Sequence, residues 1–507
     1  ARKYSTVKPS QFLKKISNEE YARIQDQLFN YKGFFVNART VRKYSSPILA
    51  NELGYIAEVD PEDLTKDSTN YYKSGDYIGK TGLEKYYEKE MRGQRGVSYK
   101  MVNVRGIDKG SFNDGSYDTL SVPGNNIIST IDLELQEYAE FLMKGKRGSI
   151  VAIEPSTGEI LAMVSSPSYN PNDLSGRNFS KNYEKIVSDT TKPLFNRAIM
   201  AKYPPGSTFK TVQALIALDK GLITADEQFF ADVARSRMGD HAASGYYDMA
   251  KGIQESSNTY FYEVMRRIVR QGLSPNLFVD SKMGLAQWTE AVKKFGFGSP
   301  LGVDLPGETA GTVPDTTYYN NLYGRHAWGY TGIYSLSIGQ GEIEVTPIQV
   351  ANLAAIIANK GYYYKPHLVK AIEKNGKIEP LFYDKVVAVE NTEFFPTVHE
   401  GMARAAKKAW RATIPDIEIL GKTGTAENGV KGETKDNSAF MAFSPRENPK
   451  IAISVYVENA GWGAGAAATT ASLMIEKHLR GYIKKRGLYR QDYILKADFL
   501  KPDTPDN

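Results

Sequence analysis

Three short groups of chemically useful residues follow one another along the chain. Ser207-Thr208-Phe209-Lys210 sets a hydroxyl one helical turn before an amine, and Ser256-Ser257-Asn258 adds a hydroxyl and an amide. Lys422-Thr423-Gly424-Thr425 adds a second lysine with two threonine hydroxyls. A serine becomes a nucleophile when a neighbouring base removes its proton. A partly desolvated lysine can be neutral, and its amine then accepts that proton. The combination indicates acyl transfer through a serine.

Each group by itself is a weak signal, because short patterns recur by chance. Ser-x-x-Lys is also present at Ser5 and Lys8, and Lys-Thr-Gly at Lys80-Thr81-Gly82. Ser-x-Asn is also present at Ser111-Phe112-Asn113 and at Ser180-Lys181-Asn182. A chain of this size is expected to contain roughly two or three chance matches to such a pattern. The residues around each match are therefore needed to distinguish a functional match from a chance one.

The surroundings favour Ser207 as the nucleophile. It follows Tyr203-Pro204-Pro205-Gly206, and an apolar helix is predicted over 207–218. A serine at the start of a helix lies at the positive end of the helix dipole, which favours developing negative charge. On that helix Lys210 shares a face with Ser207. The match at Ser5 lacks this arrangement, since Pro9 follows it and no apolar helix does.

The other two groups lie on elements that suit supporting roles. Ser256 and Asn258 fall within a helix predicted over 253–269, where Ser256 is positioned to relay a proton and Asn258 to hold Lys210. Lys422-Thr423-Gly424-Thr425 continues a strand predicted over 418–425, and a strand edge is suited to docking an extended peptide. Lys422 and the two threonines are expected to receive a terminal carboxylate, and Gly424 to allow close approach of substrate.

Apolar periodicity predicts the elements around these groups. Strands are expected over 149–153, 160–164, 439–444 and 451–457, with the first two forming a hairpin. Helices are expected over 19–29, 83–91, 133–143, 288–295, 347–359 and 465–479. Strands at both ends of a segment with helices between them predict an α/β fold of the α+β type, with one antiparallel sheet flanked by helices.

Composition narrows the remaining possibilities. A chain of 507 residues needs two or more domains, and the absence of cysteine excludes thiol catalysis and disulfides. The net charge of +6 comes without a basic block, which makes nucleic acid an improbable partner. A phosphate loop fails because Asp416 and Ser74 stand where glycine is needed. Asp240-His241 is interpreted as a surface-loop feature instead of a metal site.

Longer stretches resemble the class B penicillin-binding proteins, closer to the elongation-type members than to the division-type ones. The resemblance covers most of 125–485. The stretches that carry it are 147–163, 196–198, 295–298, 303–308 and 337–341, with 79–88 and 92–93 resembling the pedestal of this class. The resemblance implies a five-stranded antiparallel sheet flanked by helices. It also implies a pedestal or dimerisation-type domain at 1–125, a transpeptidase domain at 126–485 and a C-terminal tail at 486–507.

The resemblance further implies a peptidoglycan D,D-transpeptidase. Ser207 attacks the carbonyl of a stem peptide ending in D-Ala-D-Ala, with Lys210 as base and Ser256 and Asn258 assisting. Lys422, Thr423, Gly424 and Thr425 bind the substrate. Backbone amides of Ser207 and Thr425 form the oxyanion hole. β-Lactams are expected to acylate Ser207, and no metal or organic cofactor is implied.

Partners and location are also implied by the resemblance. A glycosyltransferase of the SEDS type and other elongation-complex proteins are the expected partners. Members of this class carry an N-terminal membrane anchor and act outside the cytoplasm, in the periplasm. The chain opens at Ala1-Arg2-Lys3-Tyr4 with no apolar run of roughly 18 residues, so a truncated start is expected.

Three alternatives share the same motifs. A serine β-lactamase needs an additional carboxylate to activate water, and no such motif is evident. A D,D-carboxypeptidase uses water as the acceptor, and a non-catalytic sensor or scaffold is acylated without turnover. Hydrolysis of a chromogenic cephalosporin separates the first from a transpeptidase.

Overall fold

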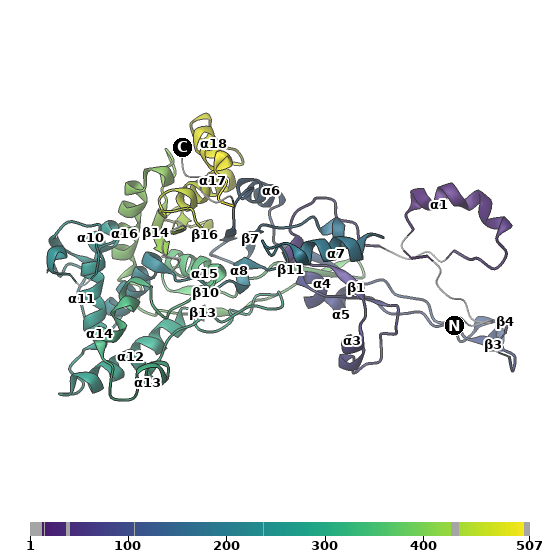
Figure 1. The fold of residues 1–507 in the computed structure, drawn as a ribbon, viewed down its shortest axis with the longest axis horizontal. Helices are drawn as coiled ribbons and strands as arrows, with labels where there is room; N and C mark the ends of the chain where they lie inside the picture. Colours follow the sequence, from purple (N-terminus) through teal and green to yellow (C-terminus); the bar gives the residue numbers. More distant parts are fainter. Residues whose placement is uncertain are drawn as a thin grey trace. The chain divides into compact units, whose positions relative to one another are not determined.

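The computed structural model describes residues 13–14, 16–36, 41–105, 107–236, 238–426 and 436–500. They belong to two compact units (Figure 1). The first consists of Ala1–Ile128, Tyr169–Leu194 and Ala371–Leu381, and the second of Ser129–Ser168, Phe195–Lys370 and Phe382–Asn507. The Ser5 to Lys8 match lies outside the described residues.

The first unit is built from short elements. Its helices are α1 (Asn18–Ile24), η1 (Gln25–Asn30), α2 (Ala50–Leu53), α3 (Pro61–Lys66), α4 (Gly82–Tyr86), α5 (Glu88–Met91), η2 (Phe112–Gly115), η3 (Pro171–Leu174) and α7 (Phe179–Ser188), where η marks a 3₁₀ helix. Antiparallel strand pairs are β1 (Ile56–Glu58) with β2 (Tyr77–Gly79) and β3 (Lys100–Val102) with β4 (Asp108–Ser111). A three-stranded sheet has the order β12 (Lys377–Pro380), β11 (Val369–Lys374), β5 (Asn126–Ser129).

Both helices predicted in this unit are found in two pieces. The segment 19–29 forms α1 and then η1, and the segment 83–91 forms α4 and α5 with a break at Tyr87. Lys80, from the second Lys-Thr-Gly match, donates from Nζ to the Asp60 carboxylate at 2.7 Å and also pairs with Asp63. That match therefore serves the structure of the first unit.

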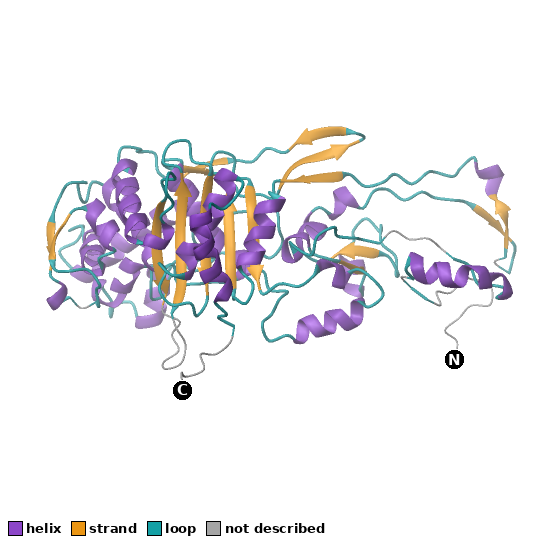
Figure 2. Ribbon diagram, turned by 90° about the horizontal axis from the view of Figure 1, so that it is seen from above, coloured by secondary structure: helices purple, strands orange, loops and turns teal. Residues whose placement is uncertain are grey.

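The second unit contains the predicted antiparallel sheet, and it has five strands. Their order is β14 (Leu420–Ala426), β15 (Asn437–Ser444), β16 (Ile451–Val457), β6 (Gly148–Ile153) and β7 (Ile160–Ser166). All neighbours pair antiparallel, and β6 and β7 form the expected hairpin. Figure 2 shows these strands side by side among helices. β14 lies at one edge of the sheet.

Helices cover both faces of this sheet. Every residue of β6, β7, β15 and β16 is buried, which explains their near-continuous apolar sequences. Apolar side chains of α6 (Leu133–Leu142) and α17 (Ala466–Arg480) form one core with one face. α15 (Pro347–Ala358) packs on β6, β15 and β16 without joining that core, so it covers the opposite face.

The remaining elements of the second unit surround this core. Its other helices are α8 (Arg197–Met200), η4 (Gly206–Phe209), α9 (Lys210–Asp219), η5 (Val233–Arg235), α10 (Met249–Glu255), α11 (Asn258–Val269), α12 (Leu277–Lys294), α13 (Thr316–Tyr323), α14 (Tyr330–Ile333), η6 (Tyr334–Ile338), α16 (Phe395–Lys408), η7 (Trp410–Ala412), η8 (Lys485–Gly487) and α18 (Leu488–Lys496). Its other strand pairs are β8 (Phe229–Ala231) with β9 (Gly245–Tyr247) and β10 (Tyr362–Tyr364) with β13 (Lys385–Val387). No helix within the described ranges has the length and apolar character to cross a bilayer.

The helices that carry the motifs differ from prediction at their starts. The expected helix over 207–218 begins as the 3₁₀ turn η4, and α9 follows from Lys210. The expected helix over 253–269 is two helices, because Ser256 adopts a left-handed conformation (φ 55°) that ends α10. The segment 288–295 is the last part of the longer helix α12. Sequence periodicity does not reveal such local breaks, since the apolar spacing continues across them.

Candidate active site

The turn that carries Ser207 is held between two other segments of the second unit. Gly206 has φ +55°, and its N–H donates to the Gly339 carbonyl oxygen at 2.9 Å. A Cβ built on Gly206 would lie 2.8 Å from the Thr425 carbonyl oxygen and 3.6 Å from the Thr425 nitrogen. Ser207 itself is half-buried. The predicted nucleophile and the end of β14 are therefore direct neighbours.

Lys210 is completely buried at the first position of α9. Its Nζ donates to the Ser256 carbonyl oxygen at 2.6 Å, to Asn258 Oδ1 at 2.6 Å and to Ser256 Oγ at 3.2 Å. Burial, followed by the nearby charge of Lys422, lowers the pKa of Lys210 well below its ordinary value. A lysine in this state accepts a proton readily, as a general base must.

The junction between α10 and α11 brings its polar groups to Lys210. The left-handed conformation of Ser256 is uncommon for a residue other than glycine and is held by contacts on both sides. Ser257 is the N-cap of α11: its Oγ accepts from the Tyr260 N–H at 3.2 Å and donates to the Asp240 carboxylate at 2.8 Å. Asn258 Nδ2 donates to the Gly239 carbonyl oxygen at 2.6 Å, which leaves Oδ1 to accept from Lys210.

The second lysine reaches the same hydroxyl from the sheet. Lys422 lies on β14, fully buried, and donates from Nζ to Ser256 Oγ at 2.8 Å and to the Thr423 carbonyl oxygen at 3.1 Å. Burial, with the charge of Lys408, lowers the pKa of Lys422 to about 7. Ser256 Oγ is thus a shared acceptor for Lys210 and Lys422, so all three motifs meet at one atom.

The end of β14 closes against the nucleophile turn. A Cβ built on Gly424 would lie 3.2 Å from the Pro205 carbonyl oxygen and 3.2 Å from the Thr208 methyl group. Gly424 therefore lies close to the turn that carries Ser207. Thr425 is half-buried, and its Oγ1 accepts from the Gly463 N–H at 3.4 Å. No strand among the described residues pairs with the edge of β14 away from β15.

Asp240 contributes to the site in a way that sequence reasoning missed, since the Asp-His pair reads from sequence as a surface-loop feature. Although burial acts to raise its pKa, hydrogen bonds from the Thr259 and Ala242 amides and from the Ser257 hydroxyl hold that pKa below the ordinary value. Its charge acts in turn on Lys210, raising the pKa of that lysine. Within the described residues no three His, Asp or Glu side chains cluster as metal ligands.

Two glycines also support the site without an evident sequence signal. Gly339 has φ +68°, and a Cβ built on it would lie 2.4 Å from the Gly206 carbonyl oxygen. A Cβ on Gly463 would lie 2.3 Å from the Gly424 carbonyl oxygen. Gly339 lies in the stretch 337–341 that carried the family resemblance, so the resemblance pointed to it without a physical reason.

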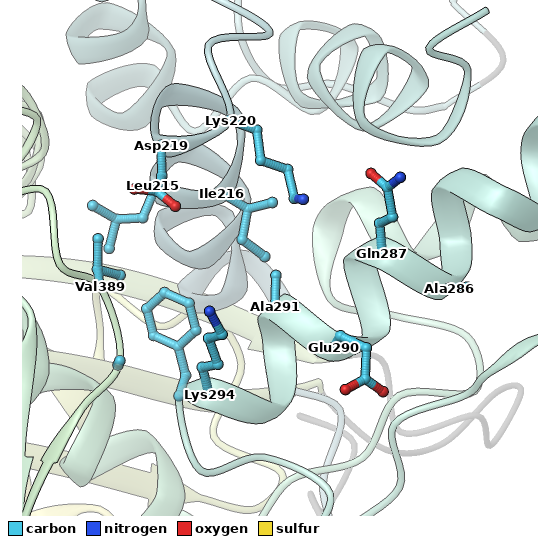
Figure 3. A pocket seen from close by; sticks show the side chains of 12 residues that line it. Leu215, Ile216, Asp219, Lys220, Ala286, Gln287, Glu290, Ala291, Lys294 and Val389 are labelled. Atoms are coloured by element: carbon cyan, nitrogen blue, oxygen red, sulfur yellow. The ribbon is translucent and has the colours of Figure 1, made fainter. Parts of the chain in front are cut away.

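A pocket of about 380 Å³ lies at the opposite end of α9 (Figure 3). Leu215, Ile216 and Lys220 contribute from the last turns of α9, facing Glu290 and Lys294 of α12. None of the motif residues lines it. This pocket is separate from the cluster around Ser256.

Family models and relatives match most of the chain. The family model for the penicillin binding protein transpeptidase domain matches residues 148–476, and that for the penicillin-binding protein dimerisation domain matches residues 1–129. The chain is 31% identical to the peptidoglycan D,D-transpeptidase MrdA of Haemophilus influenzae over 97% of its length and 77% of that protein. It is 29% identical to MrdA of Escherichia coli over 92% of its length and 75% of that protein.

Solved structures show the same fold. The Pseudomonas aeruginosa PBP2 in complex with WCK 5153 is 30% identical, with a TM-score of 0.70 over 91% of this chain and 93% of that one. PBP2 of Helicobacter pylori, solved in complex with MreC, is 26% identical, with a TM-score of 0.77 over 92% and 84%. The penicillin G acyl-enzyme of Mycobacterium tuberculosis penicillin-binding protein A is 28% identical, with a TM-score of 0.59 over 71% and 82%. The chain belongs to the penicillin-binding protein transpeptidase family, in the class B group that contains the PBP2 proteins.

Proposed function

We propose that this chain is a peptidoglycan D,D-transpeptidase that joins stem peptides through an acyl-enzyme at Ser207. The observation that carries the proposal is the meeting of Lys210 and Lys422 at Ser256 Oγ, beside the turn that bears Ser207. Its relatives in Haemophilus influenzae and Escherichia coli are named for the same reaction.

In the first half-reaction, Lys210 takes the proton of Ser207 as the serine oxygen attacks the penultimate D-Ala carbonyl of a stem peptide. The Ser207 and Thr425 amides donate to the oxyanion. The bond to the terminal D-Ala then breaks. Lys210, which Asn258 holds in place, returns the proton through the Ser256 hydroxyl to the leaving amine. An ester at Ser207 remains.

In the second half-reaction, an amine from another stem peptide attacks the ester. Its proton passes to Lys210 and then to the Ser207 oxygen as the new amide forms.

The donor peptide is bound at β14 before its terminal D-Ala leaves. The protonated form of Lys422 and the Thr423 and Thr425 hydroxyls hold its carboxylate, with the backbone at Gly424 along the strand edge. Peptide placed along the free edge of β14 brings its carbonyl to Ser207.

A water-activating hydrolase is a weaker interpretation of the same cluster. Asp240 is the carboxylate whose charge acts on Lys210, and three hydrogen bonds tie it to its own loop and to α11. Those bonds take three of the roughly four lone-pair sites of the carboxylate, so it is poorly suited to activating a water. We therefore assign hydrolysis of the acyl-enzyme, by β-lactamase or carboxypeptidase chemistry, to a minor role at most.

The setting proposed for this activity is cell-wall elongation outside the cytoplasm. The PBP2 of Helicobacter pylori forms a complex with MreC, and the same type of partner suits this chain. A SEDS-type glycosyltransferase is the proposed source of glycan strands. A membrane anchor on the N-terminal side of Ala1 is part of this proposal.

Covalent labelling tests the proposal. The wild-type protein is treated with fluorescent penicillin, and the adduct is located by peptide mapping and mass spectrometry. Labelling is expected on the peptide that contains Ser207, with one adduct per chain. Ser207→Ala is expected to abolish it, whereas Ser5→Ala, which removes the serine of the other Ser-x-x-Lys match, keeps it. An adduct on another peptide would reject the site, and rapid release of the adduct would favour a β-lactamase.

A further inference from the structure

Two of the four tryptophans of this chain are exposed, and both lie in the second unit. Trp288 and Trp328 are buried, whereas Trp410 is 57% and Trp462 is 64% exposed. Trp410 begins η7, and Trp462 lies in the loop between β16 and α17. Large aromatic side chains left in water commonly mark a binding surface.

A set of contacts connects the two tryptophans. The Arg411 guanidinium carbon lies 4.6 Å from the Trp410 ring centroid and 4.3 Å from that of Tyr493 on α18. A Cβ built on Gly465 would lie 3.7 Å from the Tyr493 hydroxyl, and the Gly465 N–H donates to the Trp462 carbonyl oxygen at 2.8 Å. We call Trp462, Tyr493, Tyr489, Arg411 and Trp410 the aromatic strip; Tyr489 joins it because it precedes Tyr493 by one turn of α18.

The strip begins at the catalytic cluster. Trp462 is followed by Gly463, whose N–H donates to Thr425 Oγ1, and the Trp462 carbonyl oxygen accepts from Ser438 Oγ of β15 at 2.9 Å. The Trp462 ring lies 4.7 Å, between centroids, from His241, next to Asp240. Trp462 therefore lies beside the end of β14 at Thr425, and the contacts through Gly465, Tyr493 and Arg411 lead from it to Trp410.

The charges along the strip select an anionic occupant. The Arg411 guanidinium has no carboxylate partner within the described ranges. Lys407 lies three residues before Trp410, and Lys485 and Arg486 shortly precede Tyr489, all with exposed side chains. Asp492 is the acidic neighbour on α18. Aromatic rings stack on the C–H face of sugars, and arginine pairs with carboxylates through two hydrogen bonds.

We infer that the aromatic strip binds a glycan strand bearing carboxylate-containing peptides, as the polymer moves past Ser207. The inference rests on the proposed function and adds to it a subsite for the polysaccharide part of the substrate. A strand held there raises the local concentration of stem peptides at the cleft. Small substrates and β-lactams, which reach only the cleft, do not use it.

Sedimentation with purified peptidoglycan sacculi tests the inference. The protein is first acylated with fluorescent penicillin, so that the cleft is occupied and only surface binding is measured. Trp410→Ala combined with Arg411→Gln is expected to raise the dissociation constant about fivefold or more. Phe382→Ala, which removes an aromatic side chain that is 91% exposed elsewhere in the second unit, is the matched control and leaves binding unchanged.

The outcomes separate this inference from the proposed function. Failure of penicillin to label Ser207 would reject the proposed chemistry, whatever the sacculi do. If the double variant is labelled normally and sediments with sacculi as the wild type does, the proposed role of the aromatic strip is wrong. If the double variant loses binding to phosphatidylglycerol vesicles but still binds sacculi, the strip binds lipid and the inference is wrong. If the double variant loses its fold, Tyr489→Ser, a change at an exposed position of α18, gives the same test.

Discussion

At the scale of single residues, one lysine of the site affects the protonation of the other, which burial has already made less basic. Lys210 and Lys422 donate to the same Ser256 hydroxyl, and the charge of Lys422 lowers the pKa of Lys210. Asp240 acts in the opposite direction and raises that pKa. The pKa of Lys210, the general base, is thus affected in opposite directions by one cation and one anion, and these effects can be measured.

The pH dependence of acylation tests this balance. In Lys422→Met the pKa of Lys210 rises, so the acid limb of the acylation rate moves to higher pH. In Asp240→Asn the pKa of Lys210 falls, and the acid limb moves to lower pH. The measurement is the rate constant for acylation at saturating penicillin, followed across the pH range for each protein. Shifts in the same direction for both variants would contradict the assignment of Lys210 as base.

The buried lysines also affect stability. A lysine whose folded pKa is about 7, against an ordinary value of 10.5, binds its proton less well when folded. Stability therefore increases with pH between these values, and the charged form is unfavourable below them. Lys422→Met is expected to raise the free energy of unfolding by up to about 4 kcal/mol at neutral pH, because each pH unit between about 7 and 10.5 is worth about 1.4 kcal/mol.

Thermal unfolding of wild type and Lys422→Met at several pH values provides the measurement. The gain should be largest near and below neutral pH and should shrink as the pH approaches the ordinary lysine pKa, because the unfolded wild type then loses its proton as well. A gain that stays constant over this range would mean that side-chain packing, and not charge burial, causes it.

At the scale of elements, glycines set how closely η4, η6 and β14 approach one another. Gly206 lies against both Gly339 and Thr425, and Gly424 lies against Pro205. A Cβ would come within 3.0 Å of backbone atoms at Gly206 and Gly339, and to 3.2 Å of the Pro205 carbonyl oxygen at Gly424. Such contacts hold the catalytic turn rigidly, as positioning of a nucleophile requires.

Gly339→Ala tests this positioning. Its Cβ would meet the Gly206 carbonyl oxygen at 2.4 Å and Phe209 Cβ at 2.7 Å, so the turn that carries Ser207 has to move. The acylation rate constant is expected to fall by about 100-fold, the scale expected for a displacement of about 1 Å. Gly302→Ala is the control: Gly302 has a similar φ of +85° but open space around it. Equal losses in both variants would attribute the effect to backbone strain alone.

At the scale of the whole molecule, the first unit is assembled from three separate parts of the chain. Its small core joins Tyr55 to Leu174 and Ile186, with Phe179 and Tyr183 packed against it. Residues 169–194 lie within the sequence matched by the transpeptidase family model, yet they belong to the first unit. A cut near residue 128 therefore does not separate the two units cleanly.

A fragment that begins at Ser129 is expected to aggregate, because Leu174, Ile186 and their neighbours lose Tyr55 and become exposed. Adding Ile186→Lys to the fragment should increase the soluble fraction. Light scattering of both fragments at equal concentration makes the comparison, and penicillin labelling reports whether the site remains formed. A monodisperse fragment without the substitution would contradict this view of the first unit.

Sequence alone determined the strands of the sheet, the order of the three motifs and the identity of the residues that meet. These features are local, because alternation and apolar runs depend on neighbours a few residues away. The resemblance to a family added the number of strands and the identity of the substrate.

Only the tertiary structure decided how those residues act together. Lys210 lies 46 positions from Ser256, and Ser256 lies 166 positions from Lys422, and no short-range pattern encodes such contacts. Tertiary packing also decided the hydrogen bonds of Asp240, the end of α10 at Ser256 and the contact between Gly424 and Pro205. Each depends on which backbone lies opposite in space, and that is settled when the sheet and helices pack.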